Sequence, residues 1–213
     1  MKYLRRTVRK ILLEEFACAS ITNPNIGGGI AELERQGLHI YSAWPLKDYD
    51  SGEANSIVLN VYDDLGDQKA WWMGTYQVDG ACLDAYQCTN TSSGNLRGTG
   101  VGALLYDVAC ELTGEKGVSS DRNEVSNAAY RMWQYFFKNE RTYEKKGAYD
   151  WDGDQTPNDP SDDCFSLTPP WEAYDDEYED PNRHPLNTVY VKKDRSRPTI
   201  KCLIEKGLIE FED

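Results

Sequence analysis

The stretch of the chain best suited to chemistry is a glycine loop at residues 97–102, with the sequence RGTGVG. Gly98, Gly100 and Gly102 lack Cβ atoms, so backbone N–H groups there can approach a ligand closely. A predicted strand precedes the loop and a predicted helix follows it, and a helix N-terminus favours an anion. Arg97 adds a planar fork of hydrogen-bond donors. The pattern predicts a pyrophosphate-binding site; a tight turn whose glycines serve only packing is the alternative.

Two common classes of phosphate loop fit this stretch poorly. A P-loop is excluded because no Gly-Lys-Ser/Thr follows the glycines. Gly98, Gly100 and Ala103 fit the dinucleotide pattern G-x-G-x-x-A, and Asp121 lies near the distance of about 20 residues expected of the ribose-binding acid. That unit should open a parallel sheet, however, whereas a strand meander is predicted before this loop. A dinucleotide-binding protein therefore remains the third choice.

The elements that would position the loop alternate in type, which predicts an α+β or mixed α/β fold. The segment NPNIGGGI (residues 23–30) is predicted to be a turn or flexible loop, because consecutive glycines weaken regular structure. One helix is predicted from Val101 to Leu112, and a second follows Ser126 or Asn123 as its cap. Its apolar face is predicted to hold Ala129, Met132, Trp133, Phe136 and Phe137. Strands are predicted at 56–63, 69–78, 80–90, 117–121 and 187–193, and a final helix from Pro198 to Gly207.

The loop and its flanking elements resemble the Gcn5-related N-acetyltransferase (GNAT) superfamily. Arg97, Gly100 and Gly102 satisfy its pattern Q/R-x-x-G-x-G/A. The resemblance covers about residues 56–146 plus 187–193, and it implies a twisted mixed sheet flanked by helices. More narrowly, LLYDVACEL, SDRNEVSNAAYRMWQYFFKNER and TPNDPSDDC resemble GNAT-like proteins of tailed phages. The implied function is transfer of an acetyl group from acetyl-CoA to an amine.

The resemblance also implies where acetyl-CoA would bind. Backbone amides of the loop would hold its pyrophosphate, and the pantetheine arm would lie along the strand that precedes the loop. The amine would enter opposite, where that strand separates from the strand predicted at 117–121. The implied binding residues are Arg97, Gly98, Thr99, Gly100, Val101, Gly102, Tyr86, Gln87 and Cys88.

The chain departs from the family pattern at the catalytic tyrosine. Family members attack the thioester directly with an amine, which needs a base and often a tyrosine that protonates the thiolate. The family helix reads N-x-x-A-x-x-L-Y, and aligning Ala129 places Trp133 at the tyrosine. Tyr130 flanks Trp133 on another side of the helix and is the remaining candidate there. Asp121 and Asp84 are candidate bases by position, with exposed or capping carboxylates as the alternative. The lost tyrosine favours a second hypothesis, a GNAT-fold structural or assembly component without turnover, including a virion protein.

The net charge of −13 comes almost entirely from one segment. Residues 150–180 contain twelve carboxylates and no Lys or Arg, so the rest of the chain has 23 basic against 24 acidic residues. This balance disfavours nucleic acid as a partner. The acidic segment would favour a small-molecule or protein amine that is cationic, such as a lysine side chain or polyamine. It does not match an EF-hand, because Gln155 and Ser161 stand where glycine and glutamate belong, and no metal is expected.

The segments together predict one elaborated domain. They are a basic amphipathic helix (1–20), a GNAT-like core (21–146), an irregular acidic insertion (147–186), and a final strand and helix that complete the core (187–213). The first helix either packs on the core or docks on a protein partner. No apolar run approaches the ~20 residues that cross a bilayer. A cytoplasmic protein, or one packaged in a virion, is expected, with its six cysteines reduced because none form closely spaced pairs.

Overall fold

The computed structural model describes residues 18–47, 54–76, 85–121, 125–147 and 185–212, and its fold is mixed α/β as expected. Four helices and an eight-stranded curled sheet make up the regular structure of these residues. The basic helix predicted within 1–20 and most of the acidic insertion fall outside the described residues. The helices are α2 (Pro24–Gln36), α3 (Val101–Thr113), α4 (Asn127–Lys138) and α5 (Pro198–Glu205).

The sheet has the order β6-β7-β5-β4-β3-β2-β1-β8. β4 pairs with β5 in parallel, β1 pairs with β8 in parallel, and every other neighbouring pair is antiparallel. The strands are β1 (His39–Lys47), β2 (Ala54–Tyr62), β3 (Gln68–Tyr76), β4 (Tyr86–Ser92), β5 (Val118–Ser119), β6 (Tyr143–Gly147), β7 (Thr188–Lys192) and β8 (Ile209–Phe211). Short 3-10 turns occupy Gly94–Leu96 and Pro185–Asn187.

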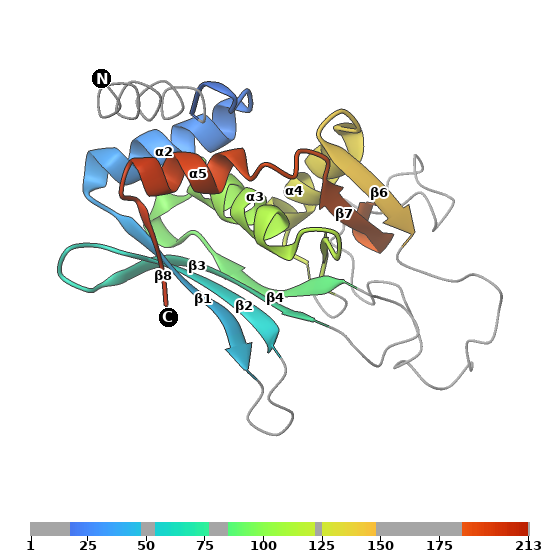
Figure 1. The fold of residues 1–213 in the computed structure, drawn as a ribbon, viewed down its shortest axis with the longest axis horizontal. Coiled ribbons are helices and arrows are strands. Elements are labelled where there is room, and N and C mark those ends of the chain that lie inside the picture. The colour runs from blue at the N-terminus through green and yellow to red at the C-terminus, as the bar shows by residue number, and fades with distance from the viewer. Residues whose placement is uncertain (1–17, 48–53, 77–84, 122–124, 148–184, 213) are drawn as a thin grey trace, which may run out of the picture.

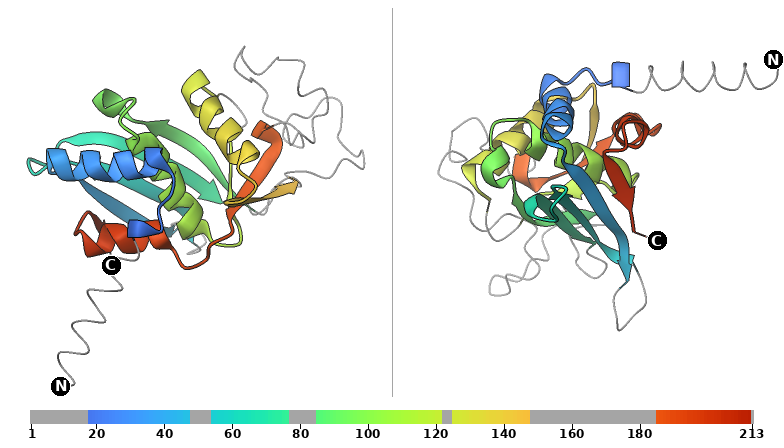
Figure 2. Two further views of the ribbon diagram at one scale, coloured as in Figure 1. Left: turned by 90° about the horizontal axis from the view of Figure 1, so that it is seen from above. Right: turned by 90° about the vertical axis from the view of Figure 1, so that its left-hand side faces the viewer.

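α3 is the central helix of the molecule. It lies between the sheet and the outer helices α2 and α5, and α4 lies beside the β5–β7 end of the sheet (Figures 1 and 2). Every residue of α3 except Gly102 is buried. An aromatic cluster fills the space between α3, α4 and β7, with Trp133 edge-on to Tyr106 and stacked on Tyr190. The close packing around α3 fixes the position of the glycine loop that precedes it.

The segment predicted to be a turn at residues 23–30 forms the first half of α2, so that prediction was wrong. Asn23 caps the helix by accepting a hydrogen bond from the Asn25 amide at 2.9 Å, and Pro24 suits the first helical position. Ile26 and Ile30 are buried against the core. Burial of this face outweighs the helix-breaking tendency of the glycines. Of the three, Gly28 and Gly29 lie close to the glycine loop, whereas no heavy atom would lie within 4 Å of a Cβ on Gly27.

The prediction for the apolar face of α4 needs a correction at Tyr130. Ser126 caps the helix as expected, and its side chain accepts from the Ala129 amide. The fully buried side chains are Tyr130, Trp133 and Phe136, whereas Met132 and Phe137 are only partly buried. Tyr130 therefore shares the core-facing side of the helix with Trp133. The strands β1, β6 and β8 were not predicted from the sequence.

The expectation that the cysteines are reduced is wrong for one pair. Cys18 and Cys202 form a disulfide across a sequence separation of 184 residues. Cys88 and Cys110 are free and buried, and Cys82 and Cys164 lie outside the described residues. Local spacing could not reveal the pair, because the fold alone brings the two segments together.

Candidate functional site

The N-terminus of α3 has the geometry of an open anion site. Gly100 is the N-cap residue with φ 93°, a left-handed conformation, and no side chain caps this helix. Gly98 also has a positive φ, 83°. Thr99 stabilises the loop, because its amide and its hydroxyl both donate hydrogen bonds to the Leu96 carbonyl oxygen, at 3.2 and 2.7 Å. The first N–H groups of α3 and its dipole are thus available to an anion.

The surroundings of the three loop glycines differ, so the reason for a glycine is not the same at each position. A Cβ atom on Gly100 would lie 2.1 Å from the Asn25 carbonyl oxygen, so Gly100 is required for contact with α2. Gly29 of α2 lies on the opposite side of this contact. A Cβ atom added to Gly29 would lie 2.7 Å from the Gly100 carbonyl oxygen. By contrast, no heavy atom would lie within 4 Å of a Cβ on Gly98, and the nearest to one on Gly102 would be Ser93 Cβ at 3.8 Å. Packing therefore explains Gly100 and the left-handed φ of 83° explains Gly98, whereas neither reason applies to Gly102.

A cavity of about 770 Å³ opens beside this helix end, and we call it the loop pocket. It lies between the glycine loop, the end of β4, the start of α4 and Asn25 of α2. Arg97 and Arg131 are the charged residues of its described lining, which contains no carboxylate. The helix end and both guanidinium groups give the pocket a positive potential.

A second cavity of about 390 Å³ lies next to the loop pocket, and we call it the strand pocket. β4 pairs with β5 only at Tyr86–Val118 and Gln87–Ser119, and beyond these pairs the two strands separate. The two pockets have Thr91, Tyr106, Ser126 and Ala129 in common, so they lie side by side. The remaining lining of the strand pocket is Cys88, Thr89, Asn90, Asp121, Val125 and Trp133.

β4 contains a bulge where it forms the wall of the strand pocket. Met73 is paired with Asn90, whereas the next residue, Gly74, is paired with Cys88, so Thr89 is an extra residue. The Thr89 hydroxyl donates to the Met73 carbonyl oxygen at 3.5 Å. A bulge locally disrupts the ladder and re-aims backbone groups, here beside the cavity.

Two protonated groups form the inner end of the strand pocket. The Cys88 thiol donates to the Tyr106 hydroxyl oxygen across 3.6 Å, and both residues are buried. Burial raises the pKa of Cys88 to about 12 and also raises the pKa of Tyr106 well above its usual value. Near pH 7 the sulfur is therefore a thiol and a poor nucleophile, while Tyr106 keeps its proton.

Some of the residues implied by the GNAT resemblance line one of the two pockets, and the others line neither. Arg97, Gly98, Gly100 and Gly102 line the loop pocket, and Cys88 and Asp121 line the strand pocket.

The other residues implied by the GNAT resemblance line neither pocket. Thr99 is turned toward Leu96, and Val101 is fully buried in the core. Tyr86 and Gln87 pair with β5, Tyr130 packs into the core, and none of these three lines either pocket. Asp84 lies outside the described residues.

Sequence reasoning missed two residues that the fold adds to the site. Tyr106 comes from the second turn of α3 and lines both pockets, and Arg131 comes from α4 and lines the loop pocket. The helical periodicity marked both helices but gave no sign that their facing sides would enclose a cavity. The presence of Tyr106 six residues after Gly100, almost two helical turns on, was the available signal.

No group of three or more His, Cys, Asp or Glu side chains suited to a metal ion occurs in the described part of the chain. Within those ranges no helix is both long enough and apolar enough to cross a membrane.

Comparison of the chain with protein-family models, with curated proteins and with solved structures gives no match.

Proposed function

We propose that this protein is an acyl-CoA-dependent N-acyltransferase with a GNAT-like core. The observation that carries the proposal is the pair of adjoining pockets with opposite charge. The loop pocket offers two arginines and a helix N-terminus, and the strand pocket offers the carboxylate of Asp121. A ligand with a phosphate-rich end suits the first pocket, and an amine suits the second.

The loop pocket fits the diphosphate end of coenzyme A. Gly98 and Gly102 leave the backbone open on the pocket side, and Arg97 and Arg131 can pair with phosphate oxygens. The pocket volume of about 770 Å³ is within the range usual for cofactor sites.

The strand pocket fits the thioester end and the reaction. Beyond Gln87, β4 no longer pairs with β5, so an extended pantetheine arm can pair with its backbone as an added strand. Bound acetyl-CoA would supply an activated acyl carbon, which the amine nitrogen attacks as the carbon–sulfur bond breaks and the thiolate leaves. Direct attack is favoured over an acyl-cysteine intermediate, because Cys88 remains a thiol near pH 7.

Two residues of the strand pocket are suited to proton handling. Asp121 lies at the end of β5 and is the candidate base for the attacking amine. Tyr106 keeps its proton and stands where the two pockets meet, so it is a candidate hydrogen-bond donor to the departing sulfur. It would serve in place of the family tyrosine, whose position Trp133 occupies.

The order of elements further supports the GNAT-like core. A strand leads into the glycine loop, and the helix, a short parallel strand, a second helix and further strands follow. This order is the one on which the sequence resemblance rests, and here it forms a single twisted sheet.

The test is acetyl transfer to a panel of amines, followed by mass spectrometry of the acceptor. The panel contains a lysine peptide, a polyamine and a neutral aromatic amine. Wild-type protein is compared with Arg97→Ala and Asp121→Asn, and Arg195→Ala is the matched control because Arg195 binds the Gly114 oxygen at the far end of α3. We expect transfer that the first two variants reduce and the control retains; absence of transfer to every amine would contradict the proposed activity.

A GNAT-fold structural component without turnover is the second candidate. Full burial of Trp133 at the tyrosine position favours it, as does the packing role of Gly100 against α2. Absence of transfer to every amine in this assay, together with calorimetric binding of acetyl-CoA, would favour this candidate.

A further inference from the structure

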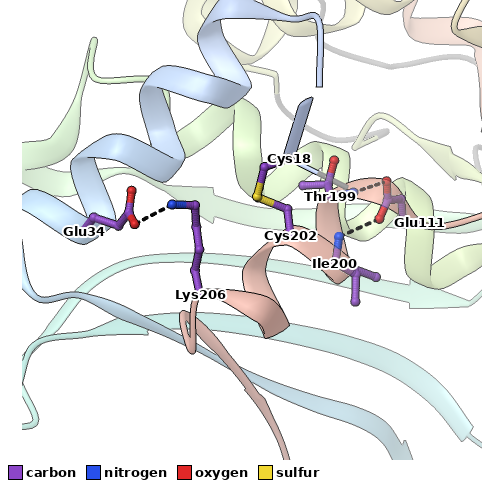
Figure 3. Close-up of a disulfide and its surroundings, with 7 residues drawn as sticks. All are labelled: Cys18, Glu34, Glu111, Thr199, Ile200, Cys202 and Lys206. Carbon is purple, nitrogen blue, oxygen red and sulfur yellow. Dashed lines mark hydrogen bonds and ion pairs between the residues drawn. A yellow bond between two sulfur atoms is a disulfide. The ribbon is translucent and has the colours of Figure 1, made fainter. Parts of the chain in front are cut away.

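The disulfide lies between two segments from opposite ends of the described chain. Cys18 belongs to residues 18–23, which we call the leading segment, and Cys202 belongs to α5 (Figure 3). Cys202 is fully buried, whereas Cys18 is half-buried. Of the two cysteines, Cys18 is therefore the one more exposed to solvent.

α5 has anchors that do not depend on the disulfide. The Glu111 carboxylate accepts hydrogen bonds from the amides of Thr199 at 3.0 Å and Ile200 at 2.8 Å, which caps the start of the helix. At the other end, Lys206 pairs with Glu34 of α2 at 2.6 Å (Figure 3). Ile200 and Leu203 are buried in the core. These contacts hold α5 in place when the sulfur–sulfur bond is broken.

The leading segment covers a third cavity of about 210 Å³. Ser20, Ile21 and Asn23 form one wall, and a buried charged group forms another. In that group Lys192 donates to Asp107 and to Glu111, each at 2.6 Å, and the Thr199 hydroxyl donates to Asp107 at 2.6 Å. Displacement of the leading segment would open this charged group to water.

The leading segment also runs directly into the contact that supports the loop pocket. Asn23 caps α2 and its side-chain amide donates to the Tyr135 hydroxyl of α4 at 2.6 Å. Two residues further on, the Asn25 carbonyl lies against Gly100, and Asn25 lines the loop pocket. The disulfide is thus seven residues from the point where α2 meets the glycine loop.

We propose that the Cys18–Cys202 disulfide is a redox switch. When oxidised, it holds the leading segment in place and thereby stabilises the conformation of the glycine loop. A dithiol transfers two electrons and two protons, so the disulfide becomes two thiols and the dithiol becomes a disulfide. Reduction leaves α5 in position, releases the leading segment, and loosens the start of α2 against Gly100. The loop pocket is therefore stably formed in the oxidised protein, and the residues that form it open more often in the reduced protein.

The test is amide hydrogen exchange on the full chain with and without dithiothreitol, with loss of the disulfide followed by mass spectrometry. Reduction is expected to speed exchange in residues 18–30 and 98–103 by about tenfold or more, equivalent to about 1.4 kcal/mol of local stability. β2 and β3, whose residues do not line the cavity beside the leading segment, are expected to keep their exchange rates. This readout requires no ligand, so its result is independent of the proposed acyltransferase activity.

Two variants separate the redox effect from other causes. Cys18→Ser/Cys202→Ser should exchange like the reduced wild type and show no response to dithiothreitol. Lys206→Gln removes the ion pair between α5 and Glu34 of α2 but leaves the disulfide, and it should keep the full response to dithiothreitol. Unchanged exchange at 98–103 in the reduced wild type would overturn the proposal, as would faster exchange spread equally over the whole chain.

Discussion

Substitution of two neighbouring glycines should have opposite effects on stability. Gly100→Ala places a Cβ 2.1 Å from the Asn25 carbonyl oxygen, so the backbone of α2 must move away. It also places alanine at φ 93°, a conformation that costs a non-glycine residue about 1–3 kcal/mol. The sum predicts a loss of at least about 2 kcal/mol in the free energy of unfolding. Gly102→Ala meets only Ser93 at 3.8 Å and should gain about 0.5–1 kcal/mol from helix propensity.

Urea unfolding without ligand, followed by circular dichroism, measures both variants against the wild type. We expect the midpoint to fall for Gly100→Ala and to rise or stay constant for Gly102→Ala. Equal stability of Gly100→Ala and wild type would refute the close contact between α2 and the glycine loop. A similar loss in both variants would refute the assignment of different reasons to the two glycines.

Three further predictions concern the buried groups. Lys192→Met leaves Asp107 and Glu111 buried without their cation and should cost about 3–5 kcal/mol in urea unfolding; a loss below about 1 kcal/mol would contradict the buried network. Burial lowers the pKa of Lys192, but the attraction of both carboxylates outweighs it, so the pKa is raised above 10.5. The stabilisation that this raised pKa provides is fully present below pH 10.5, and it is lost as the pH rises through the pKa of Lys192 in the folded protein. Stability should therefore fall more steeply at alkaline pH in the wild type than in Lys192→Met. Burial raises the pKa of Cys88 to about 12, so iodoacetamide at pH 8 should spare Cys88 until urea unfolds the chain, as peptide mass spectrometry can show.

The sequence predicted the centre of the fold better than its edges. Strong periodicity marked α3 and α4, with Gly114 at the end of α3 and Ser126 at the start of α4, and alternation marked β2 and β3. β8 has only three residues, and β6 has the sequence YEKKG, which lacks the apolar alternation of a strand. β1 was also missed, although it has nine residues. α2 was missed because its helix signal is weakened by Gly27, Gly28 and Gly29, and the tertiary contact with Gly100 explains only why Gly29 is a glycine.

The candidate site was predictable in part for the same reason. Arg97, Gly98 and Gly102 are close in sequence, so their spacing indicated a shared ligand. Tyr106 and Arg131 enter the pockets only because α3 and α4 face each other, which no local pattern shows. The bonded partner of Cys18 lies 184 residues away and likewise depends on the complete fold.

The central claim is that the loop pocket holds an acyl-CoA, and calorimetric titration of acetyl-CoA tests it most directly. Gly102→Val should narrow the pocket, and its Cβ would meet no atom closer than Ser93 Cβ at 3.8 Å. Arg131→Ala removes a cation from the pocket wall, and Arg195→Ala is the surface control. The account predicts micromolar binding to the wild type and the control, and at least about tenfold weaker binding to the other two variants. Absence of binding to the wild type at millimolar ligand, or equal binding to all four proteins, would contradict it.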